Sequence, residues 1–118
     1  MQKAQAQRMF EDVSFLTRLR PFRNYENLES LEAVVNYLKE ELELFSLDFL
    51  KQQWMAEGNQ YTNLIHSYQP DKKKRLIMGA HYDVCGDQPG ADDNGSAVAG
   101  LLETIRLIYE DKLELDYG

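Results

Sequence analysis

The feature that most constrains the fold of this chain is a short apolar run that ends in side chains able to bind a metal. Residues 76–80 read LIMGA, and His81, Tyr82 and Asp83 follow directly. A run of this kind is typical of a strand that is covered on both faces and opens into a site at its carboxyl end. We therefore predict a strand over residues 74–82 that delivers His81 to a site.

An acidic loop and a helix follow this strand. Residues 89–96 read PGADDNGS, and residues 95–110 carry apolar side chains at helical spacing. His81 and Asp83 leave the same face of an extended segment, so Asp83 can accept a hydrogen bond from the imidazole and orient it. An imidazole with the adjacent carboxylates of Asp92 and Asp93 suits a divalent cation such as zinc. Asp93 fits a helix cap equally well.

Other kinds of site fit these residues less well. Ser96 lies outside a G-x-S-x-G motif, and the acidic positions do not alternate as in an EF-hand loop. A phosphate-binding loop needs more glycine and a lysine at the start of the helix. Cys85 is a weaker candidate ligand, because a lone thiol is usually a small apolar residue. The alternative without a binding site is that His81 and Asp92 belong to a polar strand end followed by a capped helix.

Two motifs of the chain resemble those of the M28 family of zinc-dependent aminopeptidases. Residues 79–83 (GAHYD) are similar to its strand motif, and residues 89–96 with 101–103 (LLE) are similar to its second motif. The resemblance implies that His81 is a terminal ligand of one zinc ion, that Asp92 bridges two zinc ions and that Asp83 orients His81. It also implies a non-proline cis peptide bond between Asp92 and Asp93.

The same resemblance implies a reaction and a substrate class. A pair of zinc ions would hydrolyse amino-terminal peptide bonds of peptide or aminoacyl substrates. Residues 81–84 (HYDV) are also similar to the strand motif of the M20 metallopeptidases and deacylases, but the entry into the next helix at residues 92–96 favours M28. An M20-type enzyme remains an alternative.

The rest of the sequence predicts helices and a hairpin. Apolar spacing predicts helices over residues 3–19 and 27–45, and shorter patterns predict strands over residues 48–55 and 60–68. Trp54 and Tyr61 are expected to pack across the hairpin. The expected fold class is α/β. It is a fragment of a three-layer α/β/α zinc-exopeptidase fold, with a mixed sheet, N-terminal helices, hairpin strands and a helix after the metal-site loop.

The later M28 motifs have no counterpart in the sequence. These are a Glu-Glu pair that supplies a general base and a ligand, a further Asp ligand and a distal His ligand. Residues 1–118 are therefore interpreted as the amino-terminal part of a single M28-like domain. We expect weak metal binding, no peptidase activity from this chain alone, and self-association or strand exchange through an exposed sheet edge. The alternative from another class is a non-catalytic interaction module that keeps the fold.

Charge and hydropathy limit the other partners. The net charge of −7 argues against nucleic acid or an anionic membrane as a partner. No apolar run is long enough to cross a bilayer, and the first residues lack the apolar core of a signal peptide. A single cysteine excludes an internal disulfide. A cytoplasmic location and secretion after processing both remain open.

Overall fold

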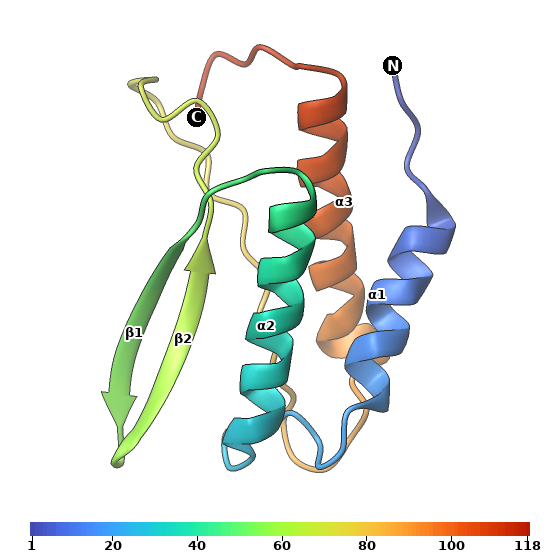
Figure 1. Cartoon of the computed structure of the whole chain (residues 1–118), viewed down its shortest axis with the longest axis vertical. Helices are drawn as coiled ribbons and strands as arrows, with labels where there is room; N and C mark the ends of the chain where they lie inside the picture. The colour runs from blue at the N-terminus through green and yellow to red at the C-terminus, as the bar shows by residue number, and fades with distance from the viewer. The chain divides into compact units, whose positions relative to one another are not determined.

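The computed structural model describes all 118 residues, which divide into two units. One unit contains residues 1–34 and 77–114, and the other contains residues 35–76 and 115–118. Three helices and one two-stranded sheet make up the regular structure (Figure 1). This combination confirms the predicted α/β class, with a two-stranded antiparallel hairpin as its sheet.

Helices α1 (Ala6–Arg18) and α3 (Ala97–Glu110) lie side by side in the first unit (Figure 1). Leu16 of α1 and Ala99 of α3 are each 1% exposed, because the apolar positions of both helices recur on one face. Both helices were predicted from this spacing. Helix α1 ends before the cis Arg20–Pro21 bond, as its sequence indicates.

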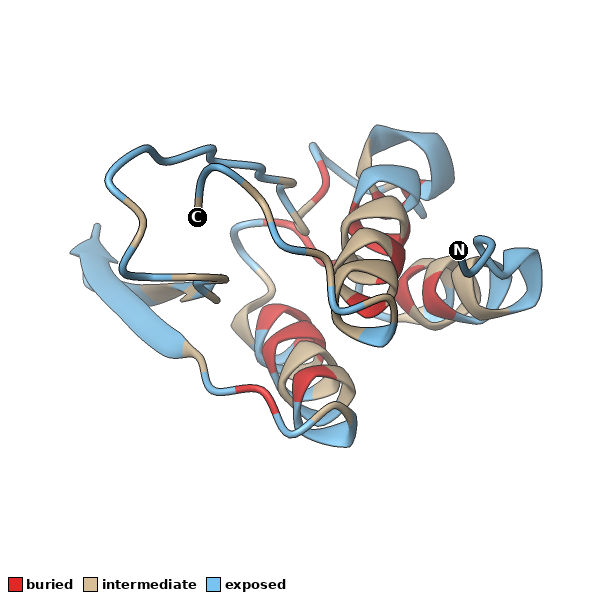
Figure 2. Cartoon of the chain, turned by 90° about the horizontal axis from the view of Figure 1, so that it is seen from above, coloured by how far each residue is buried: buried red, intermediate tan, exposed pale blue.

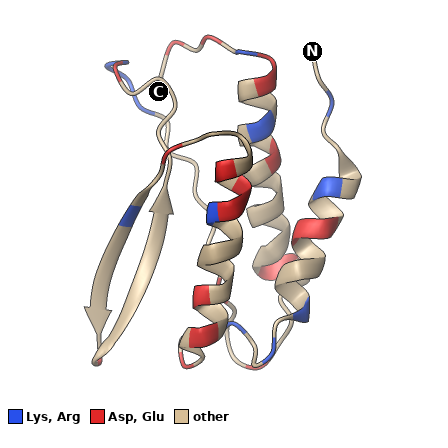
Figure 3. Ribbon diagram, viewed as in Figure 1, with Lys and Arg blue, Asp and Glu red and all other residues tan.

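Helix α2 (Leu28–Leu44) contributes residues to both units. Four members of its predicted apolar stripe are buried (Leu31, Val34, Val35 and Leu42), while Leu38 and Phe45 are half-buried, and its acidic residues stand out along the helix in Figure 3. Glu32, Glu40 and Glu43 are exposed. These three acidic residues therefore lie on the solvated side of α2.

The second unit contains a hairpin of β1 (Leu50–Ala56) and β2 (Asn59–Ile65). Glu57 and Gly58 join the strands with φ values of 50° and 80°, as a two-residue hairpin turn requires. Trp54 lies opposite Tyr61 with ring centroids 5.9 Å apart, which confirms their predicted packing. All of β1 is exposed (Figure 2), and Lys51 is the one charged residue in the two strands (Figure 3).

The predicted strand over residues 74–82 is wrong. This segment is irregular, and residues 77–80 make no backbone hydrogen bond to another strand. Ile77 is 91% exposed and Met78 is 52% exposed, whereas the prediction was a strand covered on both faces. An apolar run needs a neighbouring strand to form a ladder, and strands β1 and β2 pair with each other.

None of the helices combines the length and the apolarity needed to cross a membrane.

Candidate metal centre

The imidazole of His81 and the carboxylate of Asp83 meet in the first unit, as their spacing predicts. Nδ1 of His81 lies 3.0 Å from Oδ1 of Asp83 and 3.3 Å from the Asp83 carbonyl oxygen. The carboxylate thus faces one ring nitrogen and leaves Nε2 directed elsewhere. This arrangement can fix the tautomer and the orientation of the ring.

Nε2 of His81 faces Asp93. It lies 3.1 Å from Oδ1 of Asp93. Asp93 belongs to the short irregular turn η1 (Ala91–Ser96), where its φ of −106° and ψ of 93° interrupt the helical path. Asn94 of the same turn donates a hydrogen bond to the carbonyl oxygen of His81 at 3.3 Å. The turn before α3 is therefore linked to His81 twice.

The structure does not bring Asp92 to His81. The Asp92 side chain is exposed, and its carbonyl oxygen accepts a hydrogen bond from the Ser96 hydroxyl at 2.8 Å. The predicted cis peptide bond between Asp92 and Asp93 is wrong, because the non-proline cis bond lies between Asp93 and Asn94. Asp93 does not cap α3, whose N-cap is Ser96. The assignment of Asp92 as a ligand stays a prediction, and the geometry favours Asp93.

The position of His81 between two carboxylates has a chemical consequence. A neutral imidazole carries one N–H, so it can donate to Asp83 or to Asp93 but not to both. With Nδ1–H directed at Asp83, Nε2 presents a lone pair beside an Asp93 oxygen. The lone pair and the negatively charged oxygen repel each other. A cation at Nε2, either a proton or a metal ion, removes this repulsion. The three side chains are between 50% and 71% exposed, so an ion can reach them from solvent.

Arg23 was not predicted, yet it touches both segments that carry the site. Its side chain donates hydrogen bonds to the carbonyl oxygens of Tyr82 (2.7 Å), Pro89 (2.5 Å), Gly90 (2.9 Å) and Leu16 (3.1 Å). Arg23 is 1% exposed. Burial lowers the pKa of its guanidinium, and the negative charge of Asp83 offsets part of this effect. An isolated arginine in an irregular segment gives no periodic signal by which sequence reasoning could find it.

Tyr82 lies between His81 and Asp83 in the chain. Burial raises the pKa of its hydroxyl, and the charge of Asp83 raises that pKa further. The tyrosine therefore stays neutral around neutral pH and adds no charge of its own to the site.

Gly90 makes the turn into Asp93 possible. Its φ is 62°, in the left-handed region that favours glycine. A Cβ atom at this position would clash with the Val84 side chain and would lie 2.7 Å from the Asp93 carbonyl oxygen and 2.9 Å from the Arg23 side chain. The backbone of the turn thus packs directly against the arginine.

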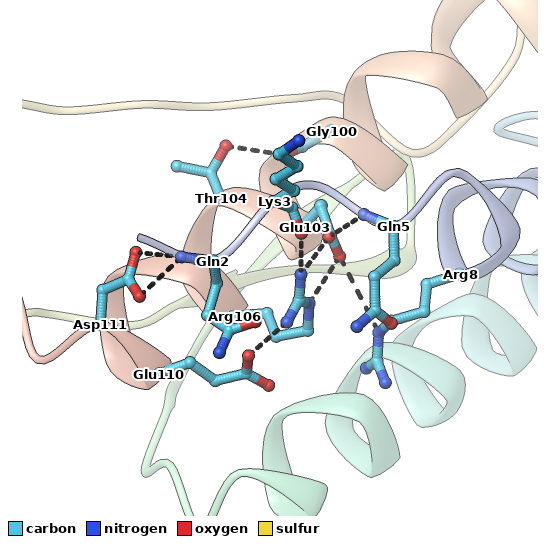
Figure 4. Close-up of polar contacts among 10 residues, drawn as sticks. All are labelled: Gln2, Lys3, Gln5, Arg8, Gly100, Glu103, Thr104, Arg106, Glu110 and Asp111. Atoms are coloured by element: carbon cyan, nitrogen blue, oxygen red, sulfur yellow. Dashed lines mark hydrogen bonds and ion pairs between the residues drawn. The ribbon is translucent and has the colours of Figure 1, made fainter.

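A second buried cluster, also not predicted, anchors helix α3 (Figure 4). Arg106 donates to both carboxylate oxygens of Glu103 at 2.9 and 2.5 Å and to Glu110 at 2.5 Å. Glu103 also accepts a hydrogen bond from the backbone N–H of Gln5 at 2.6 Å. The hydrogen bonds with Arg106 hold the pKa of Glu103 below its ordinary value. The cluster ties α3 to the segment before α1.

The comparisons with known proteins fit this geometry. The sequence model of peptidase family M28 matches residues 63–118, which include His81, Asp83 and Asp93. Over this segment the chain is similar to peptidase family M28. The chain is also 34% identical over 115 residues to a protein of Escherichia coli (strain K12) named "Uncharacterized protein YfbL". The match covers 91% of this chain and 36% of that relative, so the chain spans about a third of the relative's length.

The M28 family is generally zinc-dependent, and the facing atoms of His81 and Asp93 suit zinc in kind and spacing. Two donor atoms at roughly 2.0 to 2.2 Å from a tetrahedral zinc ion lie roughly 3.4 Å from each other. The 3.1 Å between Nε2 and Oδ1 is close to this value. However, no group of three or more His, Cys, Asp or Glu side chains is placed to hold a metal ion. The structure thus brings together two candidate ligands, His81 and Asp93.

Proposed function

We propose that this chain provides part of the metal site of an M28-type metallo-aminopeptidase. One observation carries the proposal: His81 presents Nε2 to an aspartate of the η1 turn, while Asp83 occupies Nδ1. A histidine ligand whose other ring nitrogen is held by a carboxylate is a recurrent arrangement at zinc sites. The match of residues 63–118 to the sequence model of peptidase family M28 supports the same proposal.

In this proposal His81 and one aspartate of the 92–93 pair bind the metal. The structure favours Asp93 for that aspartate, and Asp92 is the assignment suggested by the resemblance. Asp83 accepts the Nδ1 proton of His81 and keeps the Nε2 lone pair directed at the ion. When bound, zinc supplies Lewis acidity and a more acidic water. The substrate class is a peptide or aminoacyl compound with a free amino terminus, and the complete site holds two zinc ions.

We further propose that the 118-residue chain alone binds zinc weakly and does not hydrolyse substrate. Catalytic zinc is usually held by three protein ligands, and a general base must accept the proton of the attacking water. His81 and Asp93 supply two ligands, and no third side chain is placed to hold the same ion with them. Weak binding without turnover is the expected behaviour of such a partial site.

A zinc titration combined with an activity assay tests the proposal. Calorimetry of the whole chain should show weak binding of one zinc ion that disappears in His81→Ala. An aminoacyl substrate with a chromogenic leaving group should show no turnover above that of free zinc. Equal zinc binding by the wild type and His81→Ala would refute the metal site. Turnover by the pure wild-type chain would refute the proposed inactivity.

A second candidate, a non-catalytic interaction module, is favoured by the apolar side chains at the surface. Leu50 and Met55, both on strand β1, are 63% and 64% exposed. Apolar exposure of this extent is typical of an interaction surface. Loss of zinc binding in His81→Ala supports the metal site, whereas a wild-type chain that binds no zinc and associates through these residues supports the module.

A further inference from the structure

We propose that Arg23 is a positioning residue for the metal site. Its guanidinium holds the segment that carries His81 and the turn that carries Asp93 at a fixed separation. The inference rests on the proposed metal site for its functional meaning, but the positioning itself is a property of the chain without metal. Arg23, both segments and both candidate ligands belong to the first unit.

On the histidine side, Arg23 binds the backbone on both sides of Asp83. Its Nε donates to the carbonyl oxygen of Tyr82, and its own carbonyl oxygen accepts a hydrogen bond from the Val84 N–H at 3.1 Å. Tyr82 is bonded directly to His81 and to Asp83 in the chain. Residues 77–80 make no backbone hydrogen bond to another strand, so no sheet ladder fixes this segment. Arg23 is therefore its main backbone anchor.

On the aspartate side, Arg23 binds the residues that lead into the η1 turn. The two terminal nitrogens of its guanidinium donate to the carbonyl oxygens of Pro89 and Gly90. The Gly90 carbonyl oxygen also accepts the Gly95 N–H at 3.0 Å, which closes the turn around Asp93. One rigid, planar group thus bonds to both segments.

Arginine suits this position for a physical reason. A guanidinium carries five N–H donors in a rigid fork, whereas the lysine ammonium carries three on a flexible stem. Arg23 is almost fully buried and forms no direct ion pair, so carbonyl dipoles compensate much of its charge and the nearby Asp83 carboxylate adds to them. A buried cation without a carboxylate partner is costly. Loss of any one of these four hydrogen bonds therefore destabilises the arrangement.

The test compares Arg23→Met and Arg23→Lys with Arg106→Met. Arg106 is also 1% exposed, but it bonds to Glu103, Glu110 and the Lys3 carbonyl rather than to the site segments. It is therefore a matched control for loss of a buried arginine. Zinc affinity is measured by calorimetry, and the ring nitrogens of the metal-free protein are observed by two-dimensional NMR at one fixed pH. The chain has two histidines, so His66 serves as an internal reference.

We expect Arg23→Met to weaken zinc binding by about 10-fold to 100-fold, as for other groups that orient metal ligands. The His81 ring signals should shift while those of His66 stay unchanged. Arg106→Met should lower stability but leave both readouts near the wild-type values. Arg23→Lys keeps the charge but cannot reproduce the four hydrogen bonds. It should therefore weaken zinc binding and shift the His81 signals by less than Arg23→Met does.

Three results would decide against the inference or separate it from the proposed function. Unchanged zinc affinity and unchanged His81 signals in a folded Arg23 variant would overturn it. If the wild type binds no zinc, the proposed function fails, and the metal-free His81 signals alone decide whether Arg23 positions the ring. If Arg23→Met does not fold, the Arg23→Lys spectrum decides: unchanged His81 signals overturn the inference, and shifted ones support it.

Discussion

Nε2 of His81 lies 3.1 Å from Oδ1 of Asp93, although the two side chains come from separate segments on either side of the Arg23 guanidinium. The neighbouring Asp92 does not share this contact. The two aspartates are adjacent in sequence, so the sequence alone does not tell which of them faces the imidazole. The structure makes that choice, and the choice can be tested.

We expect Asp93→Asn to weaken zinc binding by about tenfold or more, and Asp92→Asn to change it little. The first substitution removes an anionic oxygen beside Nε2 of His81, whereas the second alters an exposed side chain that does not contact the ring. Calorimetric titration of both variants measures the difference. The reverse order of effects would assign the ligand to Asp92.

We expect Gly90→Ala to destabilise the protein by about 1 to 3 kcal/mol, because the new Cβ is strained at positive φ and crowds Val84 and Arg23. Urea unfolding measures the change. Gly100→Ala is the matched control: a Cβ there meets nothing within 4 Å, and alanine favours helix α3. Equal stability of the Gly90 and Gly100 variants would contradict the tight packing of the turn.

The Glu103–Arg106 pair predicts a specific pH dependence. The pKa of Glu103 is lower in the folded state than its ordinary value of 4.5, chiefly through the hydrogen bonds with Arg106. The unfolded state thus takes up the proton first as the pH falls. The pair's contribution to stability is fully present above about pH 4.5 and is lost as the pH falls through the lower folded-state pKa.

Accordingly, Glu103→Gln should cost about 3 kcal/mol at pH 7, and the difference from the wild type should shrink as the pH falls below about 4.5. Chemical unfolding at several pH values measures it. Glu110→Gln is the graded control, because the Glu110 side chain is 39% exposed and should contribute less. A wild-type advantage that stayed constant down to pH 2 would show that Glu103 is not the titrating group.

We expect the chain to self-associate through the apolar segment around Ile77. This residue is 91% exposed, and the backbone of residues 77–80 makes no hydrogen bond to another strand, so a second copy can pair with it. Ile77→Lys should weaken the association by about tenfold or more, since burial of an isoleucine stabilises by about 1.5 to 3 kcal/mol. Light scattering over a concentration series measures this effect. Leu44→Lys, at another exposed apolar residue, is the control, and a monomeric wild type at every concentration would exclude the association.

The helices and the hairpin could be predicted because their signals are local. The apolar stripe of α2 and the short strand patterns around Glu57-Gly58 depend only on neighbouring residues. The predicted bounds differ from the structure by at most three residues, as at the start of α1 and the end of β2. The contact of His81 with Asp83 was predicted for the same reason, because residues two apart in an extended segment project from the same face.

The remaining features depend on contacts between distant parts of the chain. Whether residues 74–82 form a strand is decided by a neighbour, and an apolar run says nothing about whether one is present. Arg23 finds partners that only the fold brings close. Arg106 bonds to Glu103 and Glu110 at helical spacing, and only its bond to the Lys3 carbonyl oxygen depends on the fold. The choice between Asp92 and Asp93 depends on the path of one short turn.

The bonds between α3 and the first residues of the chain bear on how the protein should be handled. Asp111 accepts the Gln2 N–H, Arg106 donates to the Lys3 carbonyl oxygen, and Glu103 accepts the Gln5 N–H. An affinity tag fused before Met1 would therefore emerge beside the last turn of α3. Trimming the first five residues would leave two buried charged groups facing water, so a shortened version should melt earlier even though it keeps every helix.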